Sequence, residues 1–109
     1  MGRRSAGWIF SRMSFASPVN RLRETNTLIA FRHPRPSYPV HILLVPKKAI
    51  SGLSALGQED AGFLEDLFAT VASLASEFEL EAAGYRLIAN GGSLQDVPQL
   101  HFHLISGTT

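Results

Sequence analysis

Apolar residues between positions 58 and 78 recur at intervals of one, three and four, a spacing that places them on one face of a helix. The members of this stripe are Phe63, Leu64, Leu67, Phe68, Val71, Leu74, Ala75 and Phe78. Glu59 and Asp60 precede the stripe, where carboxylates complement the positive end of a helix dipole. The pattern predicts one long helix from about Gln58 to Phe78, packed by this face against a sheet.

Runs of apolar residues predict strands on both sides of this helix. Thr27–Phe31 is short and rich in β-forming residues, and the proline-rich stretch 33–39 ends it. Val40–Pro46 is apolar throughout except for His41, which indicates a strand with both faces covered. After the helix, Gly84–Asn90 predicts a further strand, which a glycine-rich turn closes.

The last predicted strand is Leu100–Ile105, in which apolar and polar residues alternate strictly. A loop of about nine residues joins it to the preceding strand, a length that suits an antiparallel pair. Residues 20–31 add a strand or two. The predicted fold class is therefore α+β, with an antiparallel sheet of about five strands and one long helix.

Length and composition narrow the class of protein. A chain of 109 residues with 45% hydrophobic content suffices for one core, so we expect a single domain over residues 1–109. Ten Lys and Arg against nine Asp and Glu give no reason to expect a nucleic-acid partner. No apolar run approaches the length of a membrane span. We expect a soluble, cytoplasmic protein without a membrane partner.

Two histidines spaced by one residue occupy the last predicted strand. Side chains two residues apart share a face of a strand, so Gln99, His101 and His103 point one way while Leu100 and Phe102 point the other. Burying such polar groups without partners costs about 1–3 kcal/mol each. The three polar side chains are therefore expected to line a cleft or to face water.

The histidine pair has the chemistry for phosphate transfer. Imidazole has an ordinary pKa of about 6.5, so at neutral pH much of it is unprotonated and nucleophilic. One ring can attack while the other holds a proton for a leaving group, and the segment Asn90–Ser93 offers N–H groups and a hydroxyl to a phosphate. Two alternatives stay open: a solvated surface pair, or a zinc site shared with His41.

Three blocks of the sequence resemble the histidine triad (HIT) family, and within it the Hint-like branch of nucleotide phosphoramidases and nucleotide hydrolases. The blocks are Val40–Ser51 (VHILLVPKKAIS), Gly84–Gly92 (GYRLIANGG) and Gln95–Gly107 (QDVPQLHFHLISG). Ile9, Phe10 and Leu28–Phe31 resemble, more weakly, the N-terminal helix and first strands of the family. The resemblance covers nearly the whole chain and implies a HIT-like fold with a short N-terminal helix.

The resemblance also implies roles for individual residues. The middle of three alternating histidines is the nucleophile of the family, so His101 would attack an α-phosphate and form a nucleotidyl-histidine that water hydrolyses. His103 would assist through hydrogen bonds, with His41 in the polar cluster beside it. The other matches to substrate-contacting positions are His33, Asn90, Gln95, Asp96 and Gln99, with Ile9, Phe10, Met13 and Phe31 over the base or, alternatively, in the core.

Three of these positions depart from the family pattern. Gln99 stands in the place of the first histidine, so an ionisable group is lost there while the nucleophile is kept. Asp96 stands in the place of a serine near the leaving group. His33 stands in the place of an acidic residue that holds the ribose hydroxyls, which puts the mode of nucleoside recognition in question.

The resemblance implies a hydrolase that needs no cofactor. The expected substrate is a nucleoside phosphoramidate, a dinucleoside polyphosphate or an adenylylated metabolite. The alternative is a catalytically weak nucleotide-binding or protein-interaction module, which the residues at Gln99 and His33 favour. By the same resemblance, two chains are expected to form a homodimer through the strand after Gly84 and the long helix.

Overall fold

The structure is a computed structural model that describes residues 21–107. Its strands are β1 (Arg21–Glu24), β2 (Leu28–Arg32), β3 (Val40–Pro46), β4 (Arg86–Ile88) and β5 (Phe102–Ser106). Its α-helices are α2 (Ala61–Glu77) and the single-turn α3 (Leu80–Ala83), and its 3-10 turns are η1 (Leu53–Ala55), η2 (Gln58–Asp60) and η3 (Gly92–Leu94).

The strands form one antiparallel sheet in the order β1-β2-β3-β5-β4. The last strand, β5, lies between β3 and β4. The strand that carries His103 is therefore internal, while β1 and β4 form the two edges. The predicted α+β class, with a five-stranded antiparallel sheet and one long helix, is confirmed.

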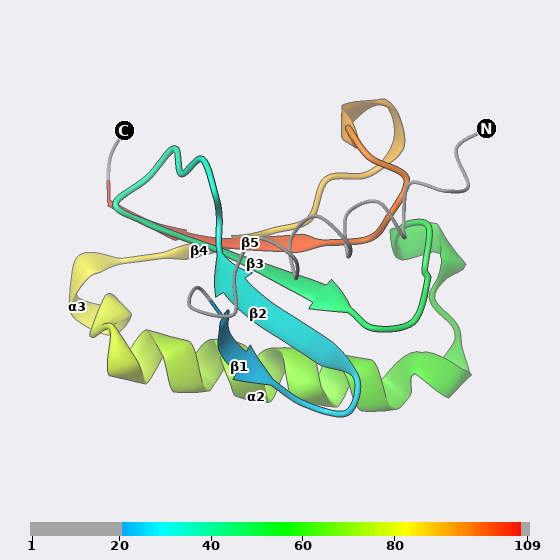
Figure 1. Ribbon diagram of the computed structural model, residues 1–109, viewed down its shortest axis with the longest axis horizontal. Helices are drawn as coiled ribbons and strands as arrows, with labels where there is room; N and C mark the ends of the chain where they lie inside the picture. The colour runs from blue at the N-terminus through cyan, green and yellow to red at the C-terminus, as the bar shows by residue number, and fades with distance from the viewer. Residues whose placement is uncertain (1–20, 108–109) are drawn as a thin grey trace.

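Helix α2 runs along one face of the sheet (Figure 1). The buried residues of α2 are Phe63, Leu67, Thr70, Val71, Leu74 and Ala75, and the five apolar ones belong to one core with Leu44, Phe102 and Leu104 from the strands. Each buried apolar side chain of this size contributes about 1.5–3 kcal/mol. The layer between helix and sheet is therefore the main source of stability in the fold.

One member of the predicted helix stripe is exposed, while Leu64 and Phe78 are partly buried against the core. The Phe68 side chain is 60% exposed, and the prediction that it packs on the sheet is wrong. At 100° of rotation per residue, Phe68 lies about 100° around the helix from the centre of the buried stripe. Its ring therefore points to the side of the helix.

The face of the sheet opposite α2 carries a second buried apolar cluster. Its members are Ile29, Phe31, Leu43 and Val45, which face one another across β2 and β3 as Phe31–Leu43 and Ile29–Val45 pairs. The loop 33–39 and the segment around η3 both rise on this side of the sheet (Figure 1). Two loops and an apolar wall therefore frame the face that lies away from the helix.

The boundaries of the predicted elements hold with local exceptions. β3 covers the predicted Val40–Pro46, but β4 is only Arg86–Ile88 and β5 begins two residues later than predicted. α2 begins three residues later than predicted because Gln58–Asp60 forms the 3-10 turn η2. The Asp60 carboxylate holds this turn by accepting the backbone N–H of Gly57 at 2.9 Å and the Lys48 ammonium at 2.8 Å. The predicted short N-terminal helix lies outside the described residues.

A membrane-crossing segment was searched for in the same part of the chain. No helix within residues 21–107 is both long enough and apolar enough to span a bilayer.

Candidate active site

All four histidines of the chain lie in one cluster. The ring centroids of His33 and His41 are 4.4 Å apart, those of His41 and His103 are 5.2 Å apart, and those of His101 and His103 are 5.1 Å apart. The sequence pointed to His41, His101 and His103 as one group. The structure brings these three together, and His33, which the resemblance placed among the substrate contacts, lies at ring-contact distance from His41.

The register of the sheet places the histidines on one face. His41 lies opposite Ile105 on β5, two residues after His103, so the two imidazoles occupy diagonal positions on the same side. His33 follows β2, and its backbone N–H donates to the carbonyl of His41 at 2.8 Å. His101 directly precedes β5. The face is the one opposite α2, because Leu104 and Phe102 fill the helix side.

A chain of hydrogen bonds fixes the tautomers of His41 and His103. The backbone N–H of Ser37 donates to Nδ1 of His41 at 3.0 Å, so neutral His41 carries its proton on Nε2. That Nε2 lies 3.0 Å from Nδ1 of His103 and donates to it. Neutral His103 therefore carries its own proton on Nε2, which makes this N–H a donor for a bound anion.

His101 is held in the opposite tautomer by its own backbone neighbourhood. Its Nδ1 lies 2.8 Å from the backbone carbonyl oxygen of Gln99. A carbonyl oxygen can only accept, so Nδ1 carries the proton and Nε2 keeps its lone pair. The ring nitrogen that points away from the backbone is therefore the nucleophilic one.

The protonation states of the cluster agree with these tautomers. Burial, followed by repulsion from the nearby imidazoles, lowers the pKa of His103 to about 4, against a weaker opposing effect of Asp96. Burial also lowers the pKa of His41, and burial together with the neighbouring His41 and His101 lowers the pKa of His33. At neutral pH the His33, His41 and His103 rings are therefore uncharged.

The side chain of Gln99 is buried behind the cluster and does not line its open side. It is 1% exposed, its Nε2 donates to the carbonyl of Leu100 at 3.2 Å, and its Oε1 has no hydrogen-bond partner within residues 21–107. Because β5 begins at Phe102, the alternation expected for the strand does not extend back to Gln99. The contact with His101 is therefore made by the backbone carbonyl of Gln99 and not by its side-chain amide.

Gln95 braces the loop that leads into the histidine motif. Its Nε2 donates to the backbone carbonyls of Ser51 at 2.7 Å and Val97 at 2.9 Å. A backbone hydrogen bond from Leu100 to Ile50, 2.7 Å long, ties the same two segments together. Both amide hydrogens of Gln95 are therefore engaged by the protein, and its role in substrate binding stays a prediction.

Asp96 and Asn90 flank the cluster without a direct bond to it in the described chain. Asp96 is exposed, and its charge raises the pKa of His103. Asn90 lies two residues after Ile88, the residue that β4 places opposite His103. Their predicted contacts with a phosphate stay predictions.

The imidazole of His33 is oriented by the turn that follows β2. Its Nδ1 accepts the backbone N–H of Arg35 at 2.9 Å, so the neutral ring carries its proton on Nε2. A carboxylate at this position would only accept hydrogen bonds, whereas this ring presents a donor. This end of the site therefore offers a hydrogen-bond donor where the resemblance implies an acceptor.

An apolar wall adjoins the histidines. Phe31 lies opposite Leu43, and Leu43 lies opposite His103, so the three share one face across β2, β3 and β5. This position suits a flat apolar group beside the imidazoles, although Phe31 is itself buried in the second cluster. The other residues expected to cover a base, Ile9, Phe10 and Met13, lie outside the described residues.

The zinc alternative does not fit this arrangement. Both ring nitrogens of His41 are engaged, one by the N–H of Ser37 and one by His103, so His41 could bind a metal only after one of these bonds had broken. No group of three His, Asp or Glu side chains within residues 21–107 is placed to hold a metal ion.

The loop 33–39 contributes groups that the sequence reading missed. Besides the N–H of Ser37, it brings the Tyr38 ring edge-on to His41, with 5.6 Å between ring centroids. Pro39 anchors the loop against Gly107, where a Cβ atom would lie 2.7 Å from the proline Cγ and where φ is +88°, so a glycine is required. The prolines signalled a rigid connection, but nothing in the sequence signalled a backbone N–H aimed at an imidazole.

Comparisons with known proteins give this geometry a context. The HIT domain model matches residues 15–109. An uncharacterized HIT-like protein of Synechococcus elongatus is 37% identical over 92 residues, which are 83% of this chain and 80% of that protein.

Solved structures agree with the sequence match. The crystal structure of a HIT family hydrolase from Legionella pneumophila aligns with a TM-score of 0.80 at 30% identity, over 93% of this chain and 92% of that one. A histidine triad nucleotide-binding protein from Candida albicans aligns with a TM-score of 0.76 at 26% identity, over 93% of this chain and 75% of that one.

Proposed function

This chain belongs to the HIT domain family, and from that premise we propose that it is a Hint-like hydrolase acting at the α-phosphate of a nucleotide derivative through a covalent nucleotidyl-histidine on His101. The substrate is a nucleoside phosphoramidate, a dinucleoside polyphosphate or an adenylylated metabolite. The observation that carries the proposal is the 2.8 Å contact between Nδ1 of His101 and the carbonyl of Gln99, because it leaves the lone pair on Nε2.

The first step is the attack of His101 Nε2 on the α-phosphorus. A P–N bond forms, and the bond between phosphorus and the leaving group breaks with its electron pair on the leaving atom, which takes a proton from water. The ring gains positive charge in this step, and the carbonyl of Gln99 stabilises that charge through the Nδ1 proton. In the second step, water attacks phosphorus, the P–N bond breaks, and the nucleoside monophosphate leaves.

The other histidines bind and position the phosphate in this proposal. Nε2–H of His103 donates to a phosphate oxygen, and His41 holds His103 in the required tautomer through the 3.0 Å bond between their rings. The low pKa of His103 keeps it a neutral donor, so it contributes a hydrogen bond and not a full charge. The apolar wall at Phe31 takes the base, and His33 donates to the ribose.

The test is turnover of an adenosine 5′-phosphoramidate, with AMP release as the readout. We expect His101→Ala to lower kcat by about four orders of magnitude or more, because the covalent route is lost. His103→Asn serves as the matched control, since it keeps the nucleophile and a side-chain N–H, and we expect it to lose far less. Acid quenching of the wild type during turnover should trap one nucleotide per chain on His101, whereas equal losses in the two variants would contradict the assignment.

The second candidate is a nucleotide-binding module with little turnover. The burial of an uncharged glutamine at position 99 favours it, because no ionisable group lies there to protonate a leaving group. Binding of AMP by calorimetry without turnover of any phosphoramidate or dinucleoside polyphosphate would select this candidate over the hydrolase.

We further propose a homodimer, acting in the cytoplasm, in which β4 and α2 meet their counterparts. β4 is an edge strand, and an open edge invites pairing with another strand. Phe68 on α2 is 60% exposed and would be covered by a second copy. Light scattering at low concentration is expected to return twice the mass of one chain, and a monomer mass would reject the dimer.

A further inference from the structure

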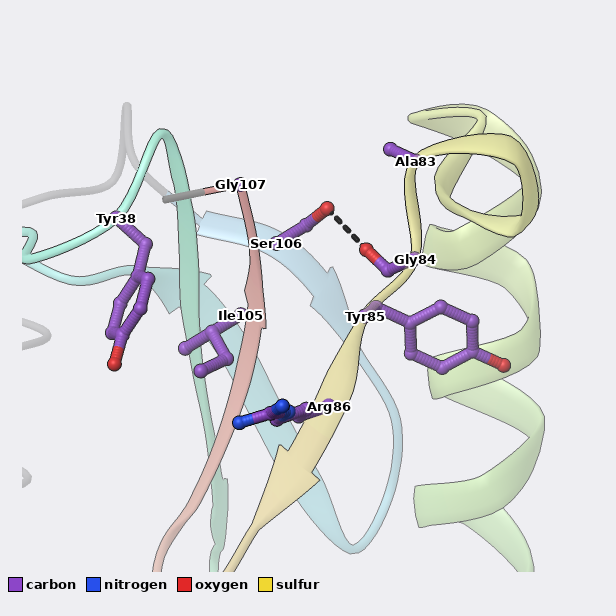
Figure 2. A pocket seen from close by; sticks show the side chains of 8 residues that line it. All are labelled: Tyr38, Ala83, Gly84, Tyr85, Arg86, Ile105, Ser106 and Gly107. Atoms are coloured by element: carbon purple, nitrogen blue, oxygen red, sulfur yellow. Dashed lines mark hydrogen bonds between the residues drawn. The ribbon is translucent and has the colours of Figure 1, made fainter. Parts of the chain in front are cut away.

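Gln99 holds a buried polar atom that the fold leaves unsatisfied. Within residues 21–107, Oε1 of its side chain is the one buried side-chain nitrogen or oxygen without a hydrogen-bond partner. The buried hydroxyl of Ser106, by contrast, donates to the backbone carbonyl of Gly84 (Figure 2). Taking an acceptor out of water without giving it a partner lowers stability. Because an apolar side chain of the same length would avoid this loss, packing alone does not explain an amide at position 99.

The nitrogen of the same amide is engaged next to the proposed nucleophile. Nε2 of Gln99 donates to the backbone carbonyl of Leu100 at 3.2 Å. That carbonyl belongs to the planar peptide unit between Leu100 and His101, so its direction fixes ψ of Leu100 and φ of His101. The side chain of Gln99 therefore holds the peptide unit that leads into His101.

The preceding peptide unit, between Gln99 and Leu100, is held at both of its ends. Its N–H, on Leu100, donates to the carbonyl of Ile50 at 2.7 Å. Its carbonyl, on Gln99, lies 2.8 Å from Nδ1 of His101. The distance between this carbonyl and the imidazole depends on the orientation of both peptide units. The amide of Gln99 thus supplies the one side-chain contact that fixes the second unit.

We propose that the side-chain amide of Gln99 is a positioning group for the nucleophile. Its bond to the Leu100 carbonyl keeps Nδ1 of His101 on the Gln99 carbonyl and thereby keeps the lone pair on Nε2. This inference rests on the proposed hydrolase function and adds to it a side chain that touches neither substrate nor reacting atoms. An amide cannot supply its N–H without also carrying an oxygen, so the unsatisfied Oε1 is the loss of stability that accompanies this function.

Gln99→Met tests the inference, because methionine keeps the length of the side chain and removes both polar atoms. The Leu100 carbonyl loses its partner, but the unsatisfied oxygen is removed as well, so the midpoint of urea unfolding should stay close to that of wild type. With an adenosine 5′-phosphoramidate as substrate, kcat should fall by about three- to tenfold, the value of one hydrogen bond. KM should change little, because the groups proposed to bind phosphate are untouched.

Nitrogen NMR of the histidine rings gives a readout that a merely structural role would not move. In wild type, Nδ1 of His101 is protonated and Nε2 is not, and two such nitrogens resonate far apart. In Gln99→Met we expect the two His101 resonances to move toward each other, because the second tautomer becomes populated. The spectrum is recorded on the free protein, so this part of the test does not depend on turnover.

Two further glutamines serve as controls for the change from an amide to a thioether. Gln58 is exposed in η2, so Gln58→Met should leave the urea midpoint, kcat and the His101 tautomer unchanged. Nε2 of Gln95 donates to two carbonyls, so Gln95→Met should lower the urea midpoint, as the loss of a purely bracing amide does. Gln99→Leu is a second apolar variant in case methionine does not fit.

The inference requires that the tautomer and kcat both change in Gln99→Met. If either stays at the wild-type value, the inference is overturned and the hydrolase is left intact. A fall in kcat that accompanies a fall in the urea midpoint, or failure of both apolar variants to fold, assigns Gln99 to packing and also overturns it. If wild type turns over no nucleotide, the hydrolase fails and the spectrum decides: a changed tautomer in Gln99→Met supports the positioning of His101 by Gln99, and an unchanged one rejects it.

Discussion

The two faces of the sheet are built from the same strands but hold their residues by different means. Toward α2, Phe102 and Leu104 are fixed by close packing in the main core. Away from α2, the next residues along the same chain segment, His101 and His103, are fixed by directional hydrogen bonds to a backbone carbonyl and to His41. The side chains on the helix face are therefore positioned by how well their volumes pack, whereas the imidazoles on the other face are positioned by which ring nitrogen carries the proton.

The largest effect that separates the two faces is expected in stability. Leu104→Ala removes a fully buried side chain and should lower the free energy of unfolding by about 2–5 kcal/mol. His103→Ala, its neighbour on the other face, removes one hydrogen bond and should cost only about 1 kcal/mol. Urea unfolding measures both, and equal losses would show that the histidine face also depends on packing.

A smaller effect is expected from pH. Because the pKa of His103 is about 4 in the fold and ordinarily about 6.5 when unfolded, the unfolded chain binds more protons between these values. The stabilisation of the fold by the neutral His103 ring is therefore complete above pH 6.5 and is lost as pH falls toward 4. The lowered pKa values of His33 and His41 act in the same direction. We expect a loss of about 1–3 kcal/mol over this range.

The comparison of the two faces supplies the control for this pH dependence. Leu104→Ala should shift the whole stability profile downward in parallel, while His103→Ala should flatten it between pH 6.5 and 5. Chemical unfolding in a pH series measures the three profiles. A profile for His103→Ala that is as steep as that of the wild type would place the titrating group elsewhere.

The smallest expected effect concerns one proton on the histidine face. Ser37→Pro removes the backbone N–H that donates to Nδ1 of His41, so His41 can adopt the other tautomer and His103 loses its defined donor. Turnover should fall by about three- to tenfold, the value of one hydrogen bond. Ser37→Ala keeps the N–H and should stay close to wild type. An equal fall in both variants would implicate the serine hydroxyl instead.

The helix face of the molecule could be predicted from the sequence because periodicity reports burial. The stripe in α2, the span of β3 and the antiparallel pairing of β4 with β5 all follow from apolar spacing and loop length. Phe68 was misplaced because a spacing of one, three or four does not fix how far around the helix the stripe extends. Such errors concern the rim of a packed layer and not its centre.

The histidine face could be predicted only in part. The shared direction of His101 and His103 follows from strand alternation, whereas the approach of His33 depends on the register between β2 and β3, which one sequence does not reveal. The burial of Gln99 depends on where β5 begins. The N–H of Ser37 has no side-chain signature at all, because every non-proline residue carries the same group.

Because all four histidines lie in one cluster, any signal from a histidine ring reports on this site. Since no imidazole lies elsewhere and the chain has no cysteine, every histidine ring resonance in an NMR spectrum originates from this site. A reagent that modifies imidazoles, such as diethyl pyrocarbonate, would likewise label this site among the histidines of the protein. Tautomers, ligand contacts and protonation can therefore be followed in the unlabelled protein, provided that any affinity tag containing histidine has been removed.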